Sequence, residues 1–267
     1  MSLRRSALVF AVGAVALIGV ACDGATPSAP TGDVFAAAPW ASGTERLEYD
    51  LRNSDGAVIG HGTLTTTVEG DRVILGQQYV EADASEGRTP ATDTVRVVVD
   101  AATFRPIEGS REVMRRTEDG ALRAEGYAWS YALDEDGDVR MTSVHTQDGE
   151  SDEDSLRARD HHYDNESSLW LWRTLAFEEG FNQNYVSVNP IERSQQTVNL
   201  QVPQLETITV PAGEFEAWRL IFRNGRAVRT AWISVDAPHV VLRWDNSDVV
   251  FELTEASASG TVEAGGR

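Results

Sequence analysis

The sequence predicts a mainly β protein: an antiparallel sheet of about a dozen strands with one inserted amphipathic helix. Three observations predict this class. Segments of alternating apolar and polar residues recur along the chain, turn residues separate them, and the helices that would connect parallel strands are missing. The clearest example runs from Glu206 to Leu253, where Pro211-Ala212-Gly213 and Asn224-Gly225 stand between alternating segments.

The amino terminus has the features of an export signal. An Arg-Arg pair precedes an apolar run from Ala7 to Val20, which is shorter than the ~20 residues that a membrane-spanning helix needs. The sole cysteine, Cys22, follows this run and resembles the lipobox of bacterial lipoproteins, although Gly19 replaces the usual branched residue. We expect residues 1–21 to be a lipoprotein signal peptide and Cys22 to carry a lipid anchor. The alternative is ordinary secretory cleavage that leaves a free thiol.

A tether and one domain are expected after the cysteine. Residues 22–43 are rich in alanine, proline, serine and glycine, a composition typical of a flexible tether. Phe35 and Trp40 within it could touch the domain or the bilayer. Residues 44–256 provide about 210 residues, enough for a single antiparallel β domain. Residues 257–267 are expected to be a disordered tail.

The charge of the chain limits its partners. The net charge is −19, and lysine is absent. Such an acidic protein is a poor ligand for nucleic acid, and its domain surface is not suited to anionic lipid. With a single cysteine no intramolecular disulfide can form. We expect an exported protein, anchored by lipidated Cys22 in the bacterial cell envelope and facing the periplasm or the exterior.

Alternating segments along the domain predict the individual strands. They cover residues 45–53, 58–68, 72–82, 94–99, 104–117, 122–133, 138–147, 195–202 and several segments between 206 and 253. The alternation is interrupted once, where apolar residues recur at helical spacing from Leu169 onward, after Asn165 or Ser167 as the cap. We expect one amphipathic helix from about Ser167 to Glu179.

Motifs in the closing half of the chain point to a known family. Leu169 to Gly180 contains Arg173-Thr174-Leu175, Val210 to Phe215 reads VPAGEF, and Trp232 to Asp236 reads WISVD. These segments resemble the bacterial domain-of-unknown-function family 3108. The chain departs from the family pattern where Val210 replaces a threonine and where Pro238 falls earlier than the usual proline.

The resemblance covers about residues 45–255. It implies a shape similar to that of the LolA and LolB type of lipoprotein carrier, a half-barrel whose curved antiparallel sheet wraps an apolar cavity closed by helix. The family has no established reaction, so the resemblance supplies no catalytic residues. It adds to the residue-level prediction the expectation of a curved sheet or half-barrel.

Aromatic side chains are the main candidates for a binding site. Tyr127, Trp129 and Tyr131 share one face of a strand, and further aromatics gather on the helix and on later strands. They either fill the core between helix and sheet or line a concave pocket for an acyl chain or another apolar ligand. The candidate pocket residues are Tyr127, Trp129, Tyr131, Trp170, Trp172, Trp218, Phe222 and Trp244.

The sequence offers no strong metal site. Adjacent His161 and His162 would point to opposite faces of a strand and are expected to be exposed in a loop. The acidic stretches from Asp134 to Asp138 and from Asp148 to Asp154 are candidates for calcium, but the first lacks the spacing of a calcium loop. We expect the first to be a hairpin turn and the second a solvated acidic loop, with no metal and no cofactor.

Catalytic motifs are also missing. No G-x-S-x-G segment is present, and Ser234, Asp236 and His239 lie too close together on one strand and turn to form a triad. We therefore expect no catalytic residues and no enzyme.

Three functions stay open. The favoured one is a non-enzymatic cell-envelope lipoprotein that binds a lipid or another apolar ligand in a concave β cavity. The second is a structural or protein-interaction module, which a solid interior without a continuous cavity would favour. The third is a hydrolase-type enzyme, which would require His61, His145 or His239 beside a carboxylate pair in a cleft.

Overall fold

The computed structural model describes residues 28–40, 42–82, 88–224 and 227–259. The strands in these residues are β1 (Gly43–Arg52), β2 (Val58–Glu69), β3 (Arg72–Glu81), β4 (Thr92–Asp100), β5 (Pro106–Arg116), β6 (Leu122–Leu133), β7 (Val139–Gln147), β8 (Glu150–Arg157), β9 (His162–Asp164), β10 (Phe181–Asn189), β11 (Ser194–Val210), β12 (Gly213–Asn224), β13 (Ala227–Ser234), β14 (Val241–Asp245) and β15 (Val250–Ser259). Three short helical segments stand between β9 and β10: η1 (Asn165–Ser167), α1 (Ser168–Leu171) and η2 (Trp172–Thr174).

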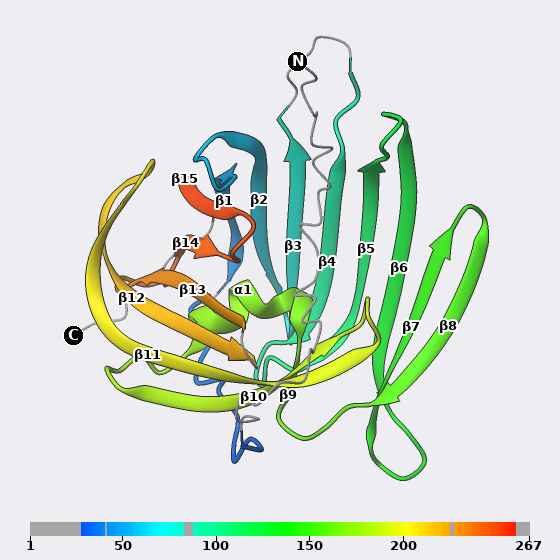
Figure 1. The fold of residues 1–267 in the computed structure, drawn as a ribbon. Coiled ribbons are helices and arrows are strands. Elements are labelled where there is room, and N and C mark those ends of the chain that lie inside the picture. The colour runs from blue at the N-terminus through cyan, green and yellow to red at the C-terminus, as the bar shows by residue number, and fades with distance from the viewer. Residues whose placement is uncertain (1–27, 41, 83–87, 225–226, 260–267) are drawn as a thin grey trace.

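All the described strands belong to one sheet (Figure 1). Its order is β8-β7-β6-β5-β4-β3-β2-β1-β15-β14-β13-β12-β11-β10-β9, so two meanders are joined where β1 pairs with β15. Every pair is antiparallel except β9 and β10, which run parallel. The prediction of a mainly β protein with a curved antiparallel sheet is confirmed, with fifteen described strands rather than about a dozen.

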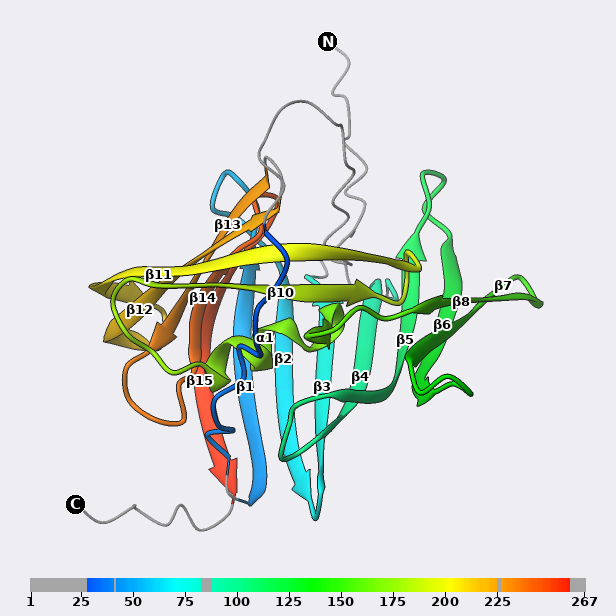
Figure 2. The same ribbon diagram turned by 90° about the horizontal axis from the view of Figure 1, so that it is seen from below.

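The order of the strands forces the sheet to curl. β8 and β9 stand at opposite ends of the sheet but are linked by residues 158–161. A flat sheet of this size would separate its ends by about 65 Å, whereas such a short linker spans at most about 18 Å. The sheet therefore bends into an unclosed barrel, whose curvature is visible in Figure 1 and Figure 2.

Side-chain hydrogen bonds link β8 to the β10–β11 hairpin across the gap in this barrel. Gln195 donates from Nε2 to the carbonyl of Arg157 at 2.8 Å and accepts from the amide of Arg159 at 2.9 Å. Arg193 donates to the carbonyl of Asp152 at 3.1 Å. The β10–β11 hairpin thus satisfies backbone groups of β8 that a further strand would otherwise pair.

The helical segments lie inside the curve of the sheet (Figure 1). They are shorter than predicted: the helix ends at Thr174, and Leu175 is already extended, with ψ near 151°. The carbonyl of Thr174 accepts hydrogen bonds from the amides of Ala36 and Ala37 instead of continuing the helix. The cap also differs, because the Asp164 side chain accepts from the amide of Glu166.

The stretch from Asp148 to Asp154, predicted to be a loop, is mostly strand. Asp148 and Gly149 form the turn, and Glu150–Arg157 is the edge strand β8. Its side chains are almost all exposed and polar, so it has no apolar alternation from which a strand could be predicted. The stretch from Asp134 to Asp138 is the hairpin turn expected, with the Asp134 carboxylate accepting from the amides of residues 136 and 138.

Cys22 and the predicted signal peptide lie outside the described residues. Residues 28–40, assigned from the sequence to the tether, run across the end of the barrel below the helix (Figure 2), and β15 continues to Ser259. No helix among the described residues is both long enough and apolar enough to cross a membrane.

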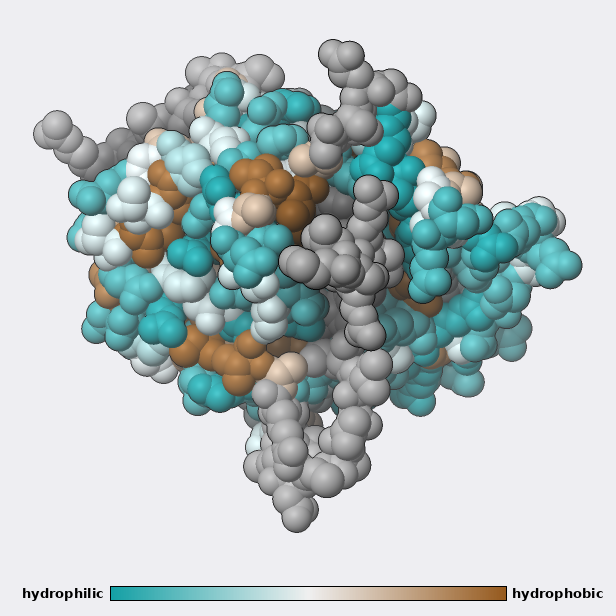
Figure 3. Space-filling view, turned by 45° about the horizontal axis from the view of Figure 1, so that its top comes forward, coloured by the Kyte–Doolittle hydropathy of each residue, from teal (hydrophilic) through white to brown (hydrophobic). Residues whose placement is uncertain are grey.

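On the face drawn in Figure 3, hydrophilic residues predominate, and the apolar patches between them are small and separate.

A glycine contact offers a test of the packing between β5 and β6. Gly109 stands opposite Trp129, and a Cβ at position 109 would lie 2.3 Å from the indole ring. We expect Gly109→Ala to lower the free energy of unfolding by about 1–3 kcal/mol, because the indole cannot yield without losing its hydrogen bond to Asp164. Urea denaturation measures this. Gly126→Ala on β6, where a Cβ meets nothing closer than 4.0 Å, is the control and should cost little; equal losses in the two variants would contradict the packing argument.

Candidate functional site

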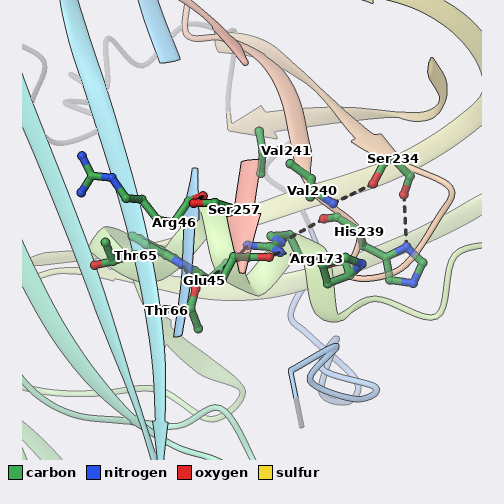
Figure 4. A network of polar contacts seen from close by, with 12 residues as sticks. Glu45, Arg46, Thr65, Thr66, Arg173, Ser234, His239, Val240, Val241 and Ser257 are labelled. Atoms are coloured by element: carbon green, nitrogen blue, oxygen red, sulfur yellow. Dashed lines mark hydrogen bonds and ion pairs between the residues drawn. The ribbon is translucent and has the colours of Figure 1, made fainter. Parts of the chain in front are cut away.

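The interior of the barrel holds two buried networks of charged side chains, one at each end of the helical segment. The first is centred on Arg173, which is 1% exposed. Its guanidinium binds the Glu45 carboxylate in a bidentate pair, at 2.7 and 2.8 Å. It also donates to the carbonyls of His239 and Pro238, at 2.9 and 3.0 Å (Figure 4). The network therefore ties the helix to β1 and to the loop 235–240.

The register of β1 explains why Glu45 faces inward. Glu45 is followed at alternate positions by Leu47, Tyr49 and Leu51, all buried, so it occupies the core face of the strand. A buried carboxylate needs a partner, and Arg173 supplies one whose planar guanidinium matches the carboxylate geometry. The ring of Trp40 lies against the same guanidinium, 4.8 Å from its centroid.

The second network surrounds Asp164, at the start of the helical segment. Its Oδ2 accepts from Trp129 Nε1 at 2.7 Å and from the Tyr131 hydroxyl at 2.8 Å, and its Oδ1 accepts from the amide of Glu166 at 2.8 Å. Burial, followed by the negative charge of Glu166, raises the pKa of Asp164 to about 7. The carboxyl is therefore close to half ionised at neutral pH.

A buried ion pair completes this network. Arg111 donates from Nε to Asp93 at 2.9 Å, and its Nη1 lies 3.6 Å from Glu166. Burial raises the pKa of both Asp93 and Glu166, in spite of the nearby guanidinium. Asp93 and Glu166 thus share the charge of Arg111, and Glu166 in turn repels Asp164, so that protonation of one of the three carboxyl groups relieves repulsion within the cluster.

Five of the eight predicted pocket residues do not form one pocket, and each of them contacts a partner within the protein. Trp129 and Tyr131 bind Asp164 as described, and Tyr127 stacks on His145 with ring centroids 4.5 Å apart. Trp170 donates from Nε1 to Thr66 Oγ1 at 2.9 Å. Trp218 stacks on Phe177 with centroids 5.9 Å apart, where the chain has left the helix.

The other three predicted residues form one cluster. The ring of Trp172 lies 3.9 Å from that of Phe222 and 4.8 Å from that of Trp244, centroid to centroid. The hollow beside them, which Tyr185 and Val198 also line, has a volume of about 30 Å³. A second hollow beside Trp244 has about 10 Å³. The larger has room for about one water molecule, whereas pockets for small ligands measure about 300–1,000 Å³.

The segment of residues 28–40, which we call the N-terminal strap, packs against the domain. Val34 is buried, and Phe35 stacks on Phe104 with ring centroids 5.9 Å apart. The Asp33 carboxylate meets Arg105 at 2.5 Å and His161 Nδ1 at 2.6 Å. The strap also reaches the Arg173 network, because Trp40 lies against the Arg173 guanidinium and the amides of Ala36 and Ala37 bind the carbonyl of Thr174.

The paired histidines serve separate contacts. His161 binds Asp33, whereas His162 Nδ1 binds the carbonyl of Arg159 at 2.9 Å and its ring stacks on Tyr131. The expectation that both are exposed is wrong for His162, which is buried in the short strand β9, where β9 pairs with β10. Within the described ranges, no three His, Cys, Asp or Glu side chains are grouped so as to hold a metal ion.

The residues considered for a triad serve the loop that they belong to. Ser234 Oγ donates to the backbone carbonyl of Asp236 at 2.9 Å, and His239 Nδ1 lies 3.1 Å from the backbone carbonyl of Ser234 (Figure 4). Their side chains do not contact one another in the manner that a nucleophile and its base require.

Sequence reasoning missed the buried charges. Their positions were visible in part, because Glu45 shares the alternation of β1, and Arg111 shares that of β5 with Val113. Charged side chains are rarely buried, so a charge at an inward position is a signal of a paired network. The partner of each charge comes from a distant segment and could not be chosen from the sequence.

The fold and the interior together define an open antiparallel β-barrel that is filled by its own helical segment. The sequence profile of the DUF3108 family, proteins of unknown function, matches residues 48–254. The chain belongs to this family, as the resemblance in its closing half predicts.

Solved structures give a fold comparison. A β-barrel-like protein of the domain-of-unknown-function family DUF1849 from Brucella abortus is similar with a TM-score of 0.53 at 9% identity, over 82% of this chain and 99% of that one. A candidate lipoprotein from Parabacteroides distasonis aligns over 85% of this chain and 100% of that one, with a TM-score of 0.29 and 9% identity. The first comparison supports the fold alone. No curated protein matches the chain significantly.

Proposed function

We propose that this protein is a non-catalytic, lipid-anchored module of the cell envelope that meets a protein partner and holds no lipid in its barrel. The observation that carries the proposal is the filled interior. The helix lies where a carrier would hold its ligand, and hydrogen bonds engage Trp129, Tyr131 and Trp170 within the protein. A bound acyl chain would have to displace the helical segment, which the two buried networks hold at its two ends.

The rival function, binding of a lipid-like ligand, has one observation in its favour. The hollow beside Trp172, Phe222 and Trp244 joins an aromatic wall to polar side chains that include Arg229. An amphiphile could enter there if the helix moved outward. Its small volume supports the interaction module instead.

The state of the interior can be tested directly. We expect the purified protein to release no stoichiometric amphiphile, other than the acyl groups of an anchor, on solvent extraction and mass spectrometry. We also expect a fluorescent fatty-acid probe to stay in solution, since a hollow of about 30 Å³ cannot take its chain. Recovery of one bound amphiphile for each protein, or saturable uptake of the probe, would overturn the proposal in favour of a carrier.

Anchoring is tested separately. We expect radiolabelled palmitate to be incorporated into the wild-type protein and lost in Cys22→Ser, because the thiol is the acceptor in the lipobox interpretation. Autoradiography of cell extracts measures this, with immunoblotting to confirm that both proteins are made. Equal labelling of the two would rule out Cys22 as the anchor.

A further inference from the structure

A groove of about 590 Å³ opens where β14 is too short to cover its neighbour. It lies between the β11–β12 turn, the loop 235–240 and β15, and residues 253–256 of β15 line it. β14 pairs with β15 only over residues 250–252, whereas β1 pairs with β15 along its whole length. From Thr254 onward, the side of β15 that faces away from β1 therefore has no partner strand among the described residues.

The backbone at this edge is suited to receive a strand. At the near end of the groove the amide of Ala212 donates to the carbonyl of Leu253 at 2.9 Å, which is a single cross-strand contact. The residues of β15 beyond it, Thr254 to Ser259, extend for about 20 Å. Unpaired amides and carbonyls on an exposed edge are the groups to which an extended peptide adds.

The other free edges of the sheet are less open. Besides β15, the sheet ends at β8 and at β9. Side chains of the β10–β11 hairpin already bind the carbonyls of Asp152 and Arg157 in β8, and β9 has three residues that are all buried. The edge of β15 is thus the better place for an added strand.

The rim of the groove is strongly acidic. Four exposed carboxylates stand around it: Glu214, Glu216, Asp236 and Glu255. In the described part of the chain none of the four forms an ion pair, and no arginine, lysine or histidine lines the groove. Four unpaired carboxylates around one groove repel each other, so a cationic occupant is favoured and an acidic one is disfavoured.

The floor of the groove is apolar. Leu242 and Leu253 lie at its base, and the half-buried Phe215 stands beside them. Leu242 faces this side because the register between β13 and β14 shifts between Trp232 and Ile233. An occupant therefore needs apolar side chains toward the floor as well as positive charge at the rim.

We propose that this groove binds an extended basic segment of a partner protein, which adds to the sheet as a strand along the free edge of β15. Alternate side chains of a strand point to opposite faces. A segment that alternates arginine with an aliphatic residue would place aliphatic groups on the Leu242 floor and guanidinium groups near the carboxylates. The inference rests on the proposed function, since it names the surface at which the module meets its partner.

The test measures fluorescence anisotropy of a labelled hexapeptide that alternates arginine and valine, titrated with the purified full chain. We expect saturable binding that weakens as salt is added. Replacing both Glu216→Gln and Glu255→Gln should weaken binding about tenfold. The matched control, Glu118→Gln with Glu135→Gln, removes the same charge from exposed turns outside the groove and should change binding by less than about twofold.

Two further peptides separate strand addition from simple charge attraction. A version with N-methylated amides on alternate residues keeps its charge and side chains but cannot donate along one edge, and we expect its binding to be lost. A version with serine in place of valine should bind more weakly, because it offers nothing to the floor. Equal binding of all three peptides, or equal losses in the groove and control variants, would overturn the inference.

Failure here and failure of the proposed function are distinguishable. If the peptide does not bind and the barrel yields no amphiphile, the groove assignment is wrong and the module meets its partner elsewhere. If an amphiphile is recovered from the barrel, the proposed function is wrong whatever the peptide does. Concentration-dependent dimers in sedimentation, abolished by Glu216→Gln with Glu255→Gln, would assign the edge to a second copy of the chain and overturn the basic-partner inference.

Discussion

Replacing Arg173 by alanine is expected to lower the free energy of unfolding by about 3–5 kcal/mol. The substitution leaves the Glu45 carboxylate buried without its bidentate partner and removes the donors that satisfy the carbonyls of Pro238 and His239. It also frees the end of the helix from the loop 235–240. Urea denaturation followed by tryptophan fluorescence measures the loss.

The double variant Glu45→Leu with Arg173→Met tests the cause. It removes both charges and fills the space with apolar side chains, so we expect it to be clearly more stable than Arg173→Ala alone. Arg96→Ala is the control for loss of an exposed arginine, because its pair with Glu108 at 3.4 Å is about half exposed and should contribute at most about 1 kcal/mol. A loss in Arg173→Ala no larger than that in Arg96→Ala would contradict the role of the buried pair.

The architecture could be predicted from the sequence because it depends on local alternation. In β1 and β2 every second side chain is buried, and turn residues mark where each strand ends. The pattern failed where burial does not alternate. β8 is a polar edge strand without apolar alternation. The helical segment ends at Thr174, whose backbone carbonyl accepts hydrogen bonds from the amides of Ala36 and Ala37 in the strap.

The interior could be predicted only in part. The sequence placed Trp129 and Tyr131 on one inward face, which the structure shows, but both the core and the pocket interpretation fitted that face. The choice between them depends on Asp164, some 35 residues further along the chain, whose carboxylate reaches both side chains. Contacts of this range are set by how the sheet closes, and a single sequence does not contain them.

The groove beside β15 could not be predicted from the sequence at all. It exists because β14 has five residues and β15 has ten, and because a register shift moves Leu242 toward the groove. The residues from Trp232 to Asp236 have a structural role in part, because Ser234 Oγ donates to the backbone carbonyl of Asp236. The same segment ends at Asp236 on the rim of the groove, so the scaffold also forms the candidate partner surface.

The protein is expected to become less stable as the pH rises from about 5 to about 8, through the ionisation of Asp164. Burial, together with Glu166, raises the pKa of this carboxyl to about 7 in the folded state, against about 3.9 in the unfolded chain. Between these values the folded state binds more protons than the unfolded state, so the free energy of unfolding falls as the pH rises. The stabilisation is fully present below the unfolded pKa and is lost once the pH exceeds about 7. Over the range from about pH 5 to pH 7 the loss amounts to about 2 kcal/mol.

Neighbouring ionisable groups also contribute to the pH dependence of the free energy of unfolding. Burial raises the pKa of Glu166 and of Asp93, so both carboxyls act in the same direction as Asp164. His162, which stacks on Tyr131, acts in the opposite direction below pH 6.5, since burial and Arg105 lower its pKa. The wild-type slope is therefore a sum, and a variant is needed to isolate the contribution of Asp164.

Asp164→Asn removes that contribution while keeping an oxygen for Trp129 and Tyr131. Its amide group faces the backbone N–H of Glu166, which adds a loss that does not depend on pH, so the slope rather than the absolute stability is the quantity to compare. We expect urea denaturation at about pH 5, 6, 7 and 8 to show a slope reduced by about 1 kcal/mol for each pH unit between about 5 and 7. Asp136→Asn, at an exposed turn, should keep the wild-type slope. If Asp164→Asn kept it too, the ionisation would have to be assigned to Glu166 or Asp93, the other buried carboxyls of the same network.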